Sequence, residues 1–303
     1  MMSKRILVGT ERGLWQSRGE VLEPVDGFTA RGVRALVQRG HEVWAIVEGR
    51  MLLHRTDGRW ADRMSFGDRR ATCLAPTPNG LLIGTAQAHL FRLVGDMLEP
   101  VESFETVEGR ETWHTPWGDP ADVRSIAVGL DGTIYVNVHV GGVVRSRDAG
   151  RSWTPTVNIE ADVHQVIAHP ARAEVVLAAA SEGFGLSRDG GDSWRFITHG
   201  LLEHYARAVA VAGDTVLVSA STGPRGRRAA LYRKPLDGDT TFVRCSDGLP
   251  WFEDNIDTAC LVADGSLVVF GTDDGRVFHS LDEGARWTRL AKGLPTITAV
   301  TIG

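Results

Sequence analysis

Cysteine is scarce in this sequence of 303 residues, which contains only three. An odd number of cysteines cannot all pair, and no two of them have the Cys-x-x-Cys spacing of a zinc site. A disulfide framework and a cysteine–zinc fold are therefore excluded. Cys73 and Cys260 fall at equivalent apolar positions of a repeat described below, so we interpret them as packing residues. Reduced thiols fit the cytoplasm, which is the location that we predict.

Long apolar runs and an excess of one charge are also missing. No apolar stretch approaches the ~18 residues of a transmembrane helix. Residues 6–8 are too short to be the apolar region of a signal peptide. The net charge is −5, and acidic and basic residues are mixed along the chain. We therefore expect neither a membrane nor a nucleic acid as partner.

One motif is present in three copies. Its frame is Ser-x-Asp-x-Gly-x-x-Trp, and the copies begin at Ser146, Ser187 and Ser280. Each copy lies between two short apolar stretches, as expected of a β-hairpin turn. The Ser and Asp side chains can hydrogen-bond backbone N–H groups inside such a turn, and the Gly supplies a residue with positive φ. The Trp then covers the outer strands. These side chains offer no reactive group, so we interpret the motif as structural.

A longer repeat of about 40 residues is typical of β-propellers and solenoids. It is marked by seven short apolar segments, at residues 33–36, 70–73, 123–126, 163–166, 206–209, 257–260 and 297–300. If each segment is the innermost strand of a four-stranded antiparallel blade, the chain is an all-β, seven-bladed β-propeller. We expect one domain over residues 1–303 and no helix.

The two ends of the chain complement each other in this arrangement. Residues 6–9 read as the second strand of a blade, with no innermost strand before them. Residues 296–302 read as an innermost strand, with no second strand after them. Pairing these two strands would complete the seventh blade and cover two exposed sheet edges. We therefore predict a ring closed by the N-terminal and C-terminal strands.

The enlarged loops are all expected on one face of the ring. They are residues 103–119, 200–205, 223–228 and 248–254. In a four-stranded blade these connections leave the face opposite to the Ser-x-Asp turns. Loops on a rigid scaffold often carry function, and the axis of a propeller is its natural pocket. The candidate site is therefore an axial funnel on the loop face.

One register position of the innermost strands is basic in several blades. Its members are Arg34, Arg124, His164 and Arg207. Strand alternation and ring closure turn equivalent positions toward one axis. Guanidinium groups match carboxylate and phosphate groups, which predicts a site for a small anionic molecule. The alternative is internal pairing, since Asp122 and Asp162 precede two of these residues by two positions.

Further candidates surround the expected funnel. Those predicted to contact a substrate are Glu11, Trp113, His114, Trp117, His204, Tyr205 and Trp251. His139 and His164 are the candidates for proton transfer, and also for ligating a divalent metal through neutral imidazoles. Neither His-x-His nor His-Glu-x-x-His spacing occurs. A carboxylate pair for glycoside hydrolysis is a third alternative. Its candidates are Asp119, Glu203, Glu253, Asp254 and Asp257.

The repeated Ser-x-Asp-x-Gly-x-x-Trp motif resembles the Asp-box (BNR) repeat of sialidase-like β-propellers, often labelled WD40/YVTN/BNR-like or exo-α-sialidase-like. This resemblance extends over nearly the whole chain and implies a propeller fold. Its members include sialidases, xyloglucanase-type glycoside hydrolases, sortilin-type receptors and a photosystem II assembly factor, so it implies no single function. The Phe/Tyr-Arg-Ile-Pro motif of true sialidases is missing, and none of the three tyrosines has a recognisable nucleophile context. Sialidase activity is therefore not expected.

Two functions of different classes follow. The first is a cytoplasmic enzyme, of hydrolase type and with or without a metal, that acts on a small anionic substrate in the axial funnel. The second is a non-catalytic scaffold or assembly factor whose loop aromatics bind a protein partner. These aromatics are Trp113, Trp117, Tyr205, Trp251 and Phe252. A deep polar axis favours the enzyme, whereas a filled axis under an aromatic rim favours the scaffold.

Overall fold

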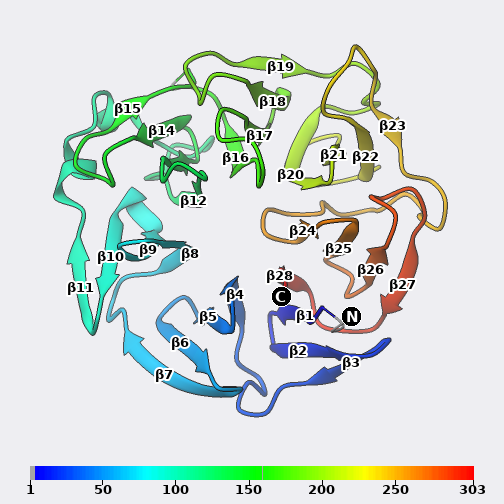
Figure 1. Ribbon diagram of the computed structural model, residues 1–303, viewed down its shortest axis with the longest axis horizontal. Helices are drawn as coiled ribbons and strands as arrows, with labels where there is room; N and C mark the ends of the chain where they lie inside the picture. Colours follow the sequence, from blue (N-terminus) through cyan, green and yellow to red (C-terminus); the bar gives the residue numbers. More distant parts are fainter. Residues whose placement is uncertain (1–3, 159) are drawn as a thin grey trace.

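The computed structural model describes residues 4–158 and 160–303. Within these residues the chain forms seven four-stranded antiparallel sheets, arranged as blades around a central axis (Figure 1). The predicted all-β, seven-bladed propeller is therefore confirmed. Of the single domain expected over residues 1–303, residues 1–3 and 159 lie outside the description. None of the helices in the described part of the chain has the length and apolar character needed to span a bilayer.

Each blade runs from an innermost strand at the axis to an outermost strand at the rim. The innermost strands are β4 (Val33–Arg39), β8 (Ala71–Thr77), β12 (Val123–Val128), β16 (Val163–Ala168), β20 (Tyr205–Ala212), β24 (Leu261–Asp264) and β28 (Ile297–Ile302). The second strands are β5 (Glu42–Val47), β9 (Gly80–Thr85), β13 (Ile134–Val138), β17 (Val176–Ala180), β21 (Thr215–Ser221), β25 (Leu267–Gly271) and β1 (Ile6–Thr10).

The outer half of most blades has shorter strands, and the outermost strands are the more exposed. The third strands are β6 (Met51–Thr56), β10 (Leu90–Val94), β14 (Val143–Ser146), β18 (Gly183–Ser187), β22 (Ala230–Pro235), β26 (Val277–Ser280) and β2 (Gly13–Arg18). The outermost strands are β7 (Arg59–Ser65), β11 (Met97–Pro100), β15 (Thr154–Pro155), β19 (Arg195–Ile197), β23 (Val243–Arg244), β27 (Thr288–Ala291) and β3 (Val21–Pro24).

The hydrophobic core lies between neighbouring blades. The second strands β13 and β17 are buried along their whole length, because an adjacent blade covers each face. One core cluster joins Tyr135 and Val143 of one blade to Val176 and Ala178 of the next. All three cysteines are free and buried, as expected for packing residues.

The ring is closed by the two ends of the chain, as predicted. Strand β28 pairs antiparallel with β1, in a register that sets Ile6 opposite Ile302 and Val8 opposite Val300. Figure 1 shows β28 as the innermost strand of the blade whose other strands come from the first residues of the chain. The edges of β1 and β28 that would otherwise be open are therefore paired.

The three Ser-x-Asp turns are stabilised by side chain–backbone hydrogen bonds. In the first turn, Gly150 N donates to Ser146 Oγ over 2.8 Å and Ser152 N donates to Asp148 Oδ1 over 2.9 Å. The turns at Ser187 and Ser280 repeat both contacts with their own residues. Gly150 has a φ of +89°, a conformation that favours glycine. These hydrogen bonds lower the pKa of the motif aspartates below the ordinary range.

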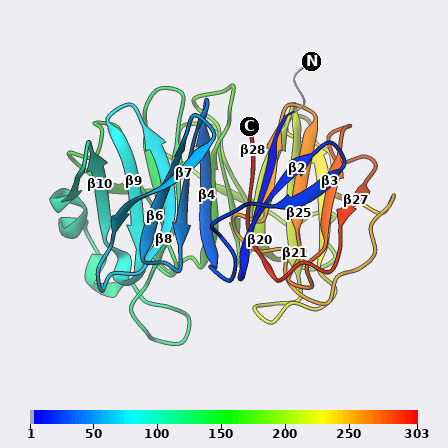
Figure 2. The same cartoon turned by 90° about the horizontal axis from the view of Figure 1, so that it is seen from below.

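The enlarged loops and the Ser-x-Asp turns lie on opposite faces. The insertion between β11 and β12 and the loop between β21 and β22 both project from the lower side of the disc in Figure 2. The Ser-x-Asp turns connect third to outermost strands, so the antiparallel order sends them to the upper side. The predicted loop face is therefore confirmed.

Two local predictions are wrong. Residues 257–260 form a turn, and β24 begins only at Leu261. Ala259 has a φ of +66°, and Cys260 N donates to Asp257 O over 3.0 Å, which closes the turn before the strand starts. Short 3-10 helices are also present. They are η1 (Ala86–Ala88), η2 (Glu102–Thr106) and η3 (Arg110–Thr112). Burial of Phe104 holds η2 against the blade.

Candidate axial site

An axial cavity of about 990 Å³ runs between the innermost strands. Its charged residues come from the starts of innermost strands, the ends of second strands and, for Asp119, the insertion before β12, all on the loop face. The charged and imidazole side chains at this end include Glu11, Arg34, Arg70, Asp122, Arg124, His139, Arg207, Asp257 and Asp273. The axis is therefore an open cavity with charged side chains at its loop-face end, where the funnel was predicted.

A β-bulge occupies each of the predicted basic positions. The register of β12 with β13 pairs Val123 with Val138 and then Ser125 with Asn137, which leaves Arg124 as the extra residue. The same shift occurs at Arg34 in β4, at His164 in β16 and at Arg207 in β20. A bulge bends the strand and redirects the extra side chain. The shared position was predicted from the sequence, but the bulges were not.

Arg124 has no anionic partner in the described part of the chain. Its Nη1 lies 2.9 Å from His139 Nε2, and burial and the nearby Arg207 lower the pKa of the guanidinium. The predicted alternative, an ion pair with Asp122, is wrong because Asp122 binds Arg70 over 2.9 Å. Arg124 is therefore a half-buried cation at the cavity wall that forms no ion pair with the described residues, although the charges of Asp257 and Asp162 nearby favour its ionised form.

The other two arginines differ from Arg124. Arg207 Nε and Nη2 both lie 2.6 Å from Asp257 Oδ1, so its charge is balanced internally. Arg34 lines the cavity but is exposed to solvent. Arg124 and Arg34 are therefore the arginines left available for a ligand.

His139, Asp162 and His164 form a tight cluster beside Arg124. Asp162 Oδ1 lies 3.4 Å from His139 Nε2 and 3.3 Å from His164 Nε2. Burial lowers the pKa of both histidines, and the Arg124 charge adds to this effect, so that the pKa of His139 is about 3. Both imidazoles are therefore neutral near pH 7. Asp162 lies beside the following histidine, but the expected neutralisation of His164 does not occur, because the imidazole carries no charge.

The prediction that His164 faces the funnel is wrong. Its side chain is 0% exposed and does not line the cavity. His164 Nδ1 is held 2.5 Å from Ala206 O in the next blade, and its ring packs 4.6 Å from the ring of Tyr205. These contacts turn the imidazole away from the axis, so His164 cannot touch a molecule in the cavity. His139, in contrast, does line it.

Of the remaining predicted contacts, only some reach the cavity. Glu11 and Trp117 line it, and Trp117 is 67% exposed with its ring 5.5 Å from that of His139. His114, His204, Tyr205 and Trp251 lie outside the lining. The backbone of His114 pairs with Val140, which anchors the insertion next to His139. Their predicted role in contacting a ligand in the cavity is therefore not supported for these four residues.

The rings of Trp251 and Tyr205 are instead covered by arginine side chains. The Arg244 guanidinium lies 4.4 Å from the centre of the Trp251 ring, and that of Arg228 lies 5.5 Å from it. The Arg207 guanidinium lies 5.8 Å from the Tyr205 ring. These contacts fix both aromatic rings through cation–π interactions.

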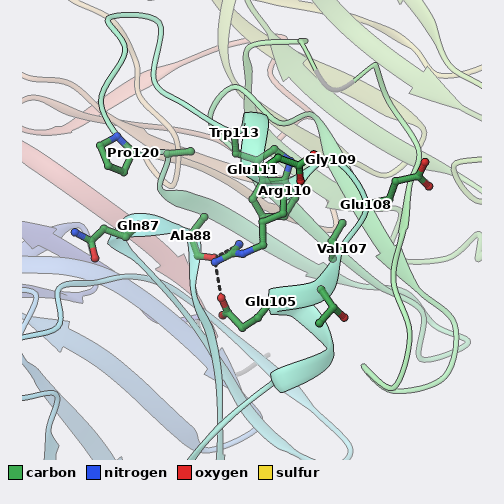
Figure 3. A pocket seen from close by; sticks show the side chains of 12 residues that line it. Gln87, Ala88, Glu105, Val107, Glu108, Gly109, Arg110, Glu111, Trp113 and Pro120 are labelled. Carbon is green, nitrogen blue, oxygen red and sulfur yellow. Dashed lines mark hydrogen bonds and ion pairs between the residues drawn. The ribbon is translucent and has the colours of Figure 1, made fainter.

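Trp113 lies at a second cavity of about 690 Å³, between the insertion and η1 (Figure 3). The Arg110 guanidinium lies 5.0 Å from the Trp113 ring and binds Glu105 over 2.6 Å. Trp113 and Phe252 are both buried, so the prediction that they belong to an exposed aromatic rim is wrong. Their large apolar surfaces pack into blade cores instead.

Asp273 is a further acidic residue that lines the axial cavity. Burial and the nearby Asp257 and Asp254 raise its pKa to about 6. Its position after the second strand β25 corresponds to that of Glu11 after β1 and His139 after β13. The end of each second strand therefore brings Asp273, Glu11 and His139 to the same rim of the cavity. Among the predicted carboxylates, Asp257 binds Arg207 and Glu203 binds Arg228 over 3.1 Å.

Fold and cavity together define a seven-bladed β-propeller with a polar axial site. No family model and no curated protein matches the sequence. Among solved structures, an ancestral GH74 enzyme is similar, with 16% identity, a TM-score of 0.65, and coverage of 89% of this chain and 38% of that one. A GH74 xyloglucanase from Xanthomonas campestris has 14% identity and a TM-score of 0.61, with coverage of 85% and 45%.

A further similar structure is YCF48 bound to a D1 peptide. Its identity is 16% and its TM-score 0.62, and the match covers 94% of this chain and 88% of that one. Identities this low establish a shared fold and leave activity open. This chain also spans less than half the length of the two GH74 proteins, at 38% and 45%.

Proposed function

We propose that the axial cavity binds a small anionic molecule of the carboxylate, phosphate or sugar-acid class, and that the protein acts on it as a hydrolase-type enzyme. The observation that carries this proposal is Arg124. A half-buried guanidinium that lacks a carboxylate partner is costly, because burial removes water from the charge. A bound anion would offset that cost and would accept a bidentate pair of N–H donors.

The same cavity wall supplies acid–base groups. Asp273, with a pKa of about 6, is poised to exchange a proton near neutral pH. His139 is the second candidate, as a neutral ring whose Nε2 faces Arg124. His164 cannot contact a substrate in the cavity directly, because its side chain is fully buried behind the wall. Similarity to the GH74 fold is consistent with a hydrolase but does not identify its substrate.

A non-catalytic protein-binding role is the second candidate. The similar YCF48 structure contains a bound peptide. On this chain, Trp117 and Trp251 are 67% and 39% exposed. Large exposed aromatics on one face are typical of protein-binding hot spots. The open axis and the burial of Trp113 and Phe252 make this candidate the weaker one.

We also propose that the chain is a propeller of the Asp-box kind and is not a sialidase. The three hydrogen-bonded Ser-x-Asp turns support the first part. A cytoplasmic location is proposed on the strength of three free and buried cysteines, which a reducing compartment would preserve.

The anion site is tested by a thermal-shift screen. Carboxylates, phosphate and sulfated sugars are added to wild type, Arg124→Met and the control Arg59→Met, whose arginine is exposed on β7. Binding to the folded state stabilises it by about 2.7 kcal/mol when the ligand is at 100 times its Kd. We expect at least one anion to raise the melting temperature of wild type and of Arg59→Met, but not of Arg124→Met.

Two outcomes would contradict the anion site: no anion stabilises wild type, or Arg124→Met responds as wild type does. Arg207→Met is a less clean variant, because it also leaves Asp257 without its partner.

An acidic peptide is included in the screen to test the protein-binding role. Stabilisation by the peptide alone, lost in Trp117→Ala and kept in Arg124→Met, would favour the protein-binding role.

A further inference from the structure

Three potential metal ligands converge behind the wall of the axial cavity. They are His139, Asp162 and His164, whose donor atoms all lie within 4.8 Å of one another. His139 follows β13, whereas Asp162 and His164 flank the first residue of β16. The backbone fixes this arrangement, since Val140 forms a β-bridge with Asp162 and Val163 N donates to His139 O over 3.2 Å. The cluster is therefore part of the rigid inner wall.

The hydrogen bond of His164 decides which of its nitrogens faces the cluster. His164 Nδ1 lies 2.5 Å from Ala206 O, which can only accept, so Nδ1 carries the proton. In the neutral ring, Nε2 then presents a lone pair toward Asp162 Oδ1, 3.3 Å away. A backbone carbonyl that orients an imidazole in this way is the usual outer partner of a metal-ligating histidine.

The lone pairs of the cluster are not satisfied by the protein. His164 Nε2 and Asp162 Oδ1 are both buried and have no hydrogen-bond partner within the described residues. Two acceptors 3.3 Å apart repel each other unless a cation or a proton lies between them. A metal ion would satisfy both atoms together.

We propose that His139, Asp162 and His164 bind one divalent transition-metal ion, with its open coordination positions toward the axial cavity. Two imidazoles and one carboxylate are a ligand set that suits zinc or ferrous iron. His139 is the ligand at the cavity wall, and Asp162 and His164 lie behind it. The sequence pattern had suggested histidines alone as ligands. Asp162 completes the set.

The position of Arg124 links this metal to the ligand of the cavity, a step that rests on the proposed function. Arg124 Nη1 now lies 2.9 Å from the His139 Nε2 that would bind the metal, so the guanidinium must move aside when metal binds. It would remain at the cavity wall, next to the open metal positions. An anion could then bind the metal and Arg124 together, which would favour phosphate and carboxylate groups over neutral molecules.

Metal binding is measured on tag-free full-length protein, by elemental analysis after zinc loading and dialysis and by calorimetric titration with Zn²⁺. The variants are His139→Gln and Asp162→Asn. The matched control is His114→Gln, an exposed histidine next to the cluster in the same blade. We expect stoichiometric zinc in wild type and in His114→Gln. Each ligand variant should weaken binding by more than the ~10–100-fold that loss of an outer partner costs.

Co²⁺ loading provides a second readout that does not depend on activity. Wild type should give visible d–d absorption bands, and both ligand variants should lose them while circular dichroism shows an intact fold. Substoichiometric zinc in wild type, or equal affinity in wild type and His139→Gln, would overturn the metal site. If Asp162 only pairs with His164, Asp162→Asn should lower the melting temperature without altering metal content, which would also overturn it.

Failure of the metal hypothesis can be distinguished from failure of the anion-binding hypothesis. A phosphate response that depends on Arg124 in protein that binds no zinc would refute the metal and keep the anion site. Stoichiometric zinc in protein that no anion stabilises would keep the metal and refute the anion site.

Discussion

Asp273 lies just beyond β25, where acidic neighbours outnumber basic ones. Burial, Asp257, Asp254 and Glu11 all raise its pKa, and only Arg207 among the nearby charges lowers it. The folded protein therefore holds the Asp273 proton up to about pH 6, whereas an unfolded chain releases it near pH 4. At neutral pH the folded state must carry a carboxylate that its surroundings disfavour. Asp273 therefore lowers the stability of the folded protein at neutral pH, and it supplies a carboxyl group that titrates near pH 6.

Replacement of Asp273 should stabilise the protein in a pH-dependent way. Between about pH 4 and pH 6 the folded state binds more protons than the unfolded state, so stability falls as the pH rises through this window. Above it the destabilisation is complete. Asp273→Asn removes this effect, and we expect a gain of about 1–2 kcal/mol at pH 7–8 that disappears near pH 4. Thermal melts of both proteins between pH 4 and pH 8 measure it.

The adjacent Asp274 provides a control of opposite sign. Burial opposes its ionisation, but hydrogen bonds from Arg276 and Thr272 outweigh burial and lower its pKa. Such a group stabilises the fold above its unfolded pKa, and this contribution is lost as the pH falls. Asp274→Asn should therefore lower the melting temperature at pH 7. A pH-independent gain in Asp273→Asn would contradict the assigned titration.

At the scale of elements, three of the second strands approach the neighbouring blade so closely that only glycine fits. A Cβ on Gly84 of β9 would lie 2.5 Å from Val123 Cγ1 of the next blade and 2.6 Å from Cys73 Sγ. Gly9 of β1 and Gly271 of β25 meet the first residue of the next innermost strand in the same way. Contacts at these distances leave no room for a methyl group. Three of the seven blade interfaces therefore pack on glycine at this position.

Gly84→Ala should destabilise the protein by about 1–3 kcal/mol, the usual cost of overpacking a core. The control is Gly223→Ala, where the added Cβ meets no atom within 4 Å and the backbone needs no positive φ. Urea unfolding of both variants gives the free-energy difference. Equal stability of the two variants would show that the blades can separate to admit the methyl group, and would contradict close packing at this interface.

At the scale of the whole molecule, the pairing of β1 with β28 makes the ring a closed structure. Each blade supplies one face of the core to each neighbour, so an incomplete blade exposes apolar surface on both sides. Val300 packs in the same core cluster as Phe270 of the sixth blade. Loss of β28 would therefore expose the core as well as the edge of β1.

Deletion of residues 296–303 should cause a large drop in melting temperature and loss of a single cooperative transition. A synthetic peptide with the sequence of residues 296–303 should restore part of that loss when added in excess, because it can pair with β1. A scrambled peptide of the same composition is the control. Truncated protein that melts as the full-length chain does would contradict closure by the two ends.

Much of the fold could be predicted because local patterns determine it. The Ser-x-Asp-x-Gly-x-x-Trp turns need only contacts within a few residues, as the bonds from Gly150 and Ser152 to their own turn show. The order of apolar segments placed six of the seven innermost strands. The exception is β24, where a turn closed by Cys260 replaces the expected strand start. Closure of the ring by β1 and β28 followed from the same order of strands.

The sequence by itself therefore determined the repeat, the closed ring, the loop face and the register position that is basic in several blades. Only the tertiary structure decided what those basic residues do. A bulge at each of these positions changes the direction of the side chain, and the neighbouring blade then binds or buries it. Arg124 thus faces the cavity without a carboxylate, whereas His164 is held by Ala206 of another blade. Contacts between residues from different blades, such as that of His164 with Ala206, leave no local pattern in the sequence.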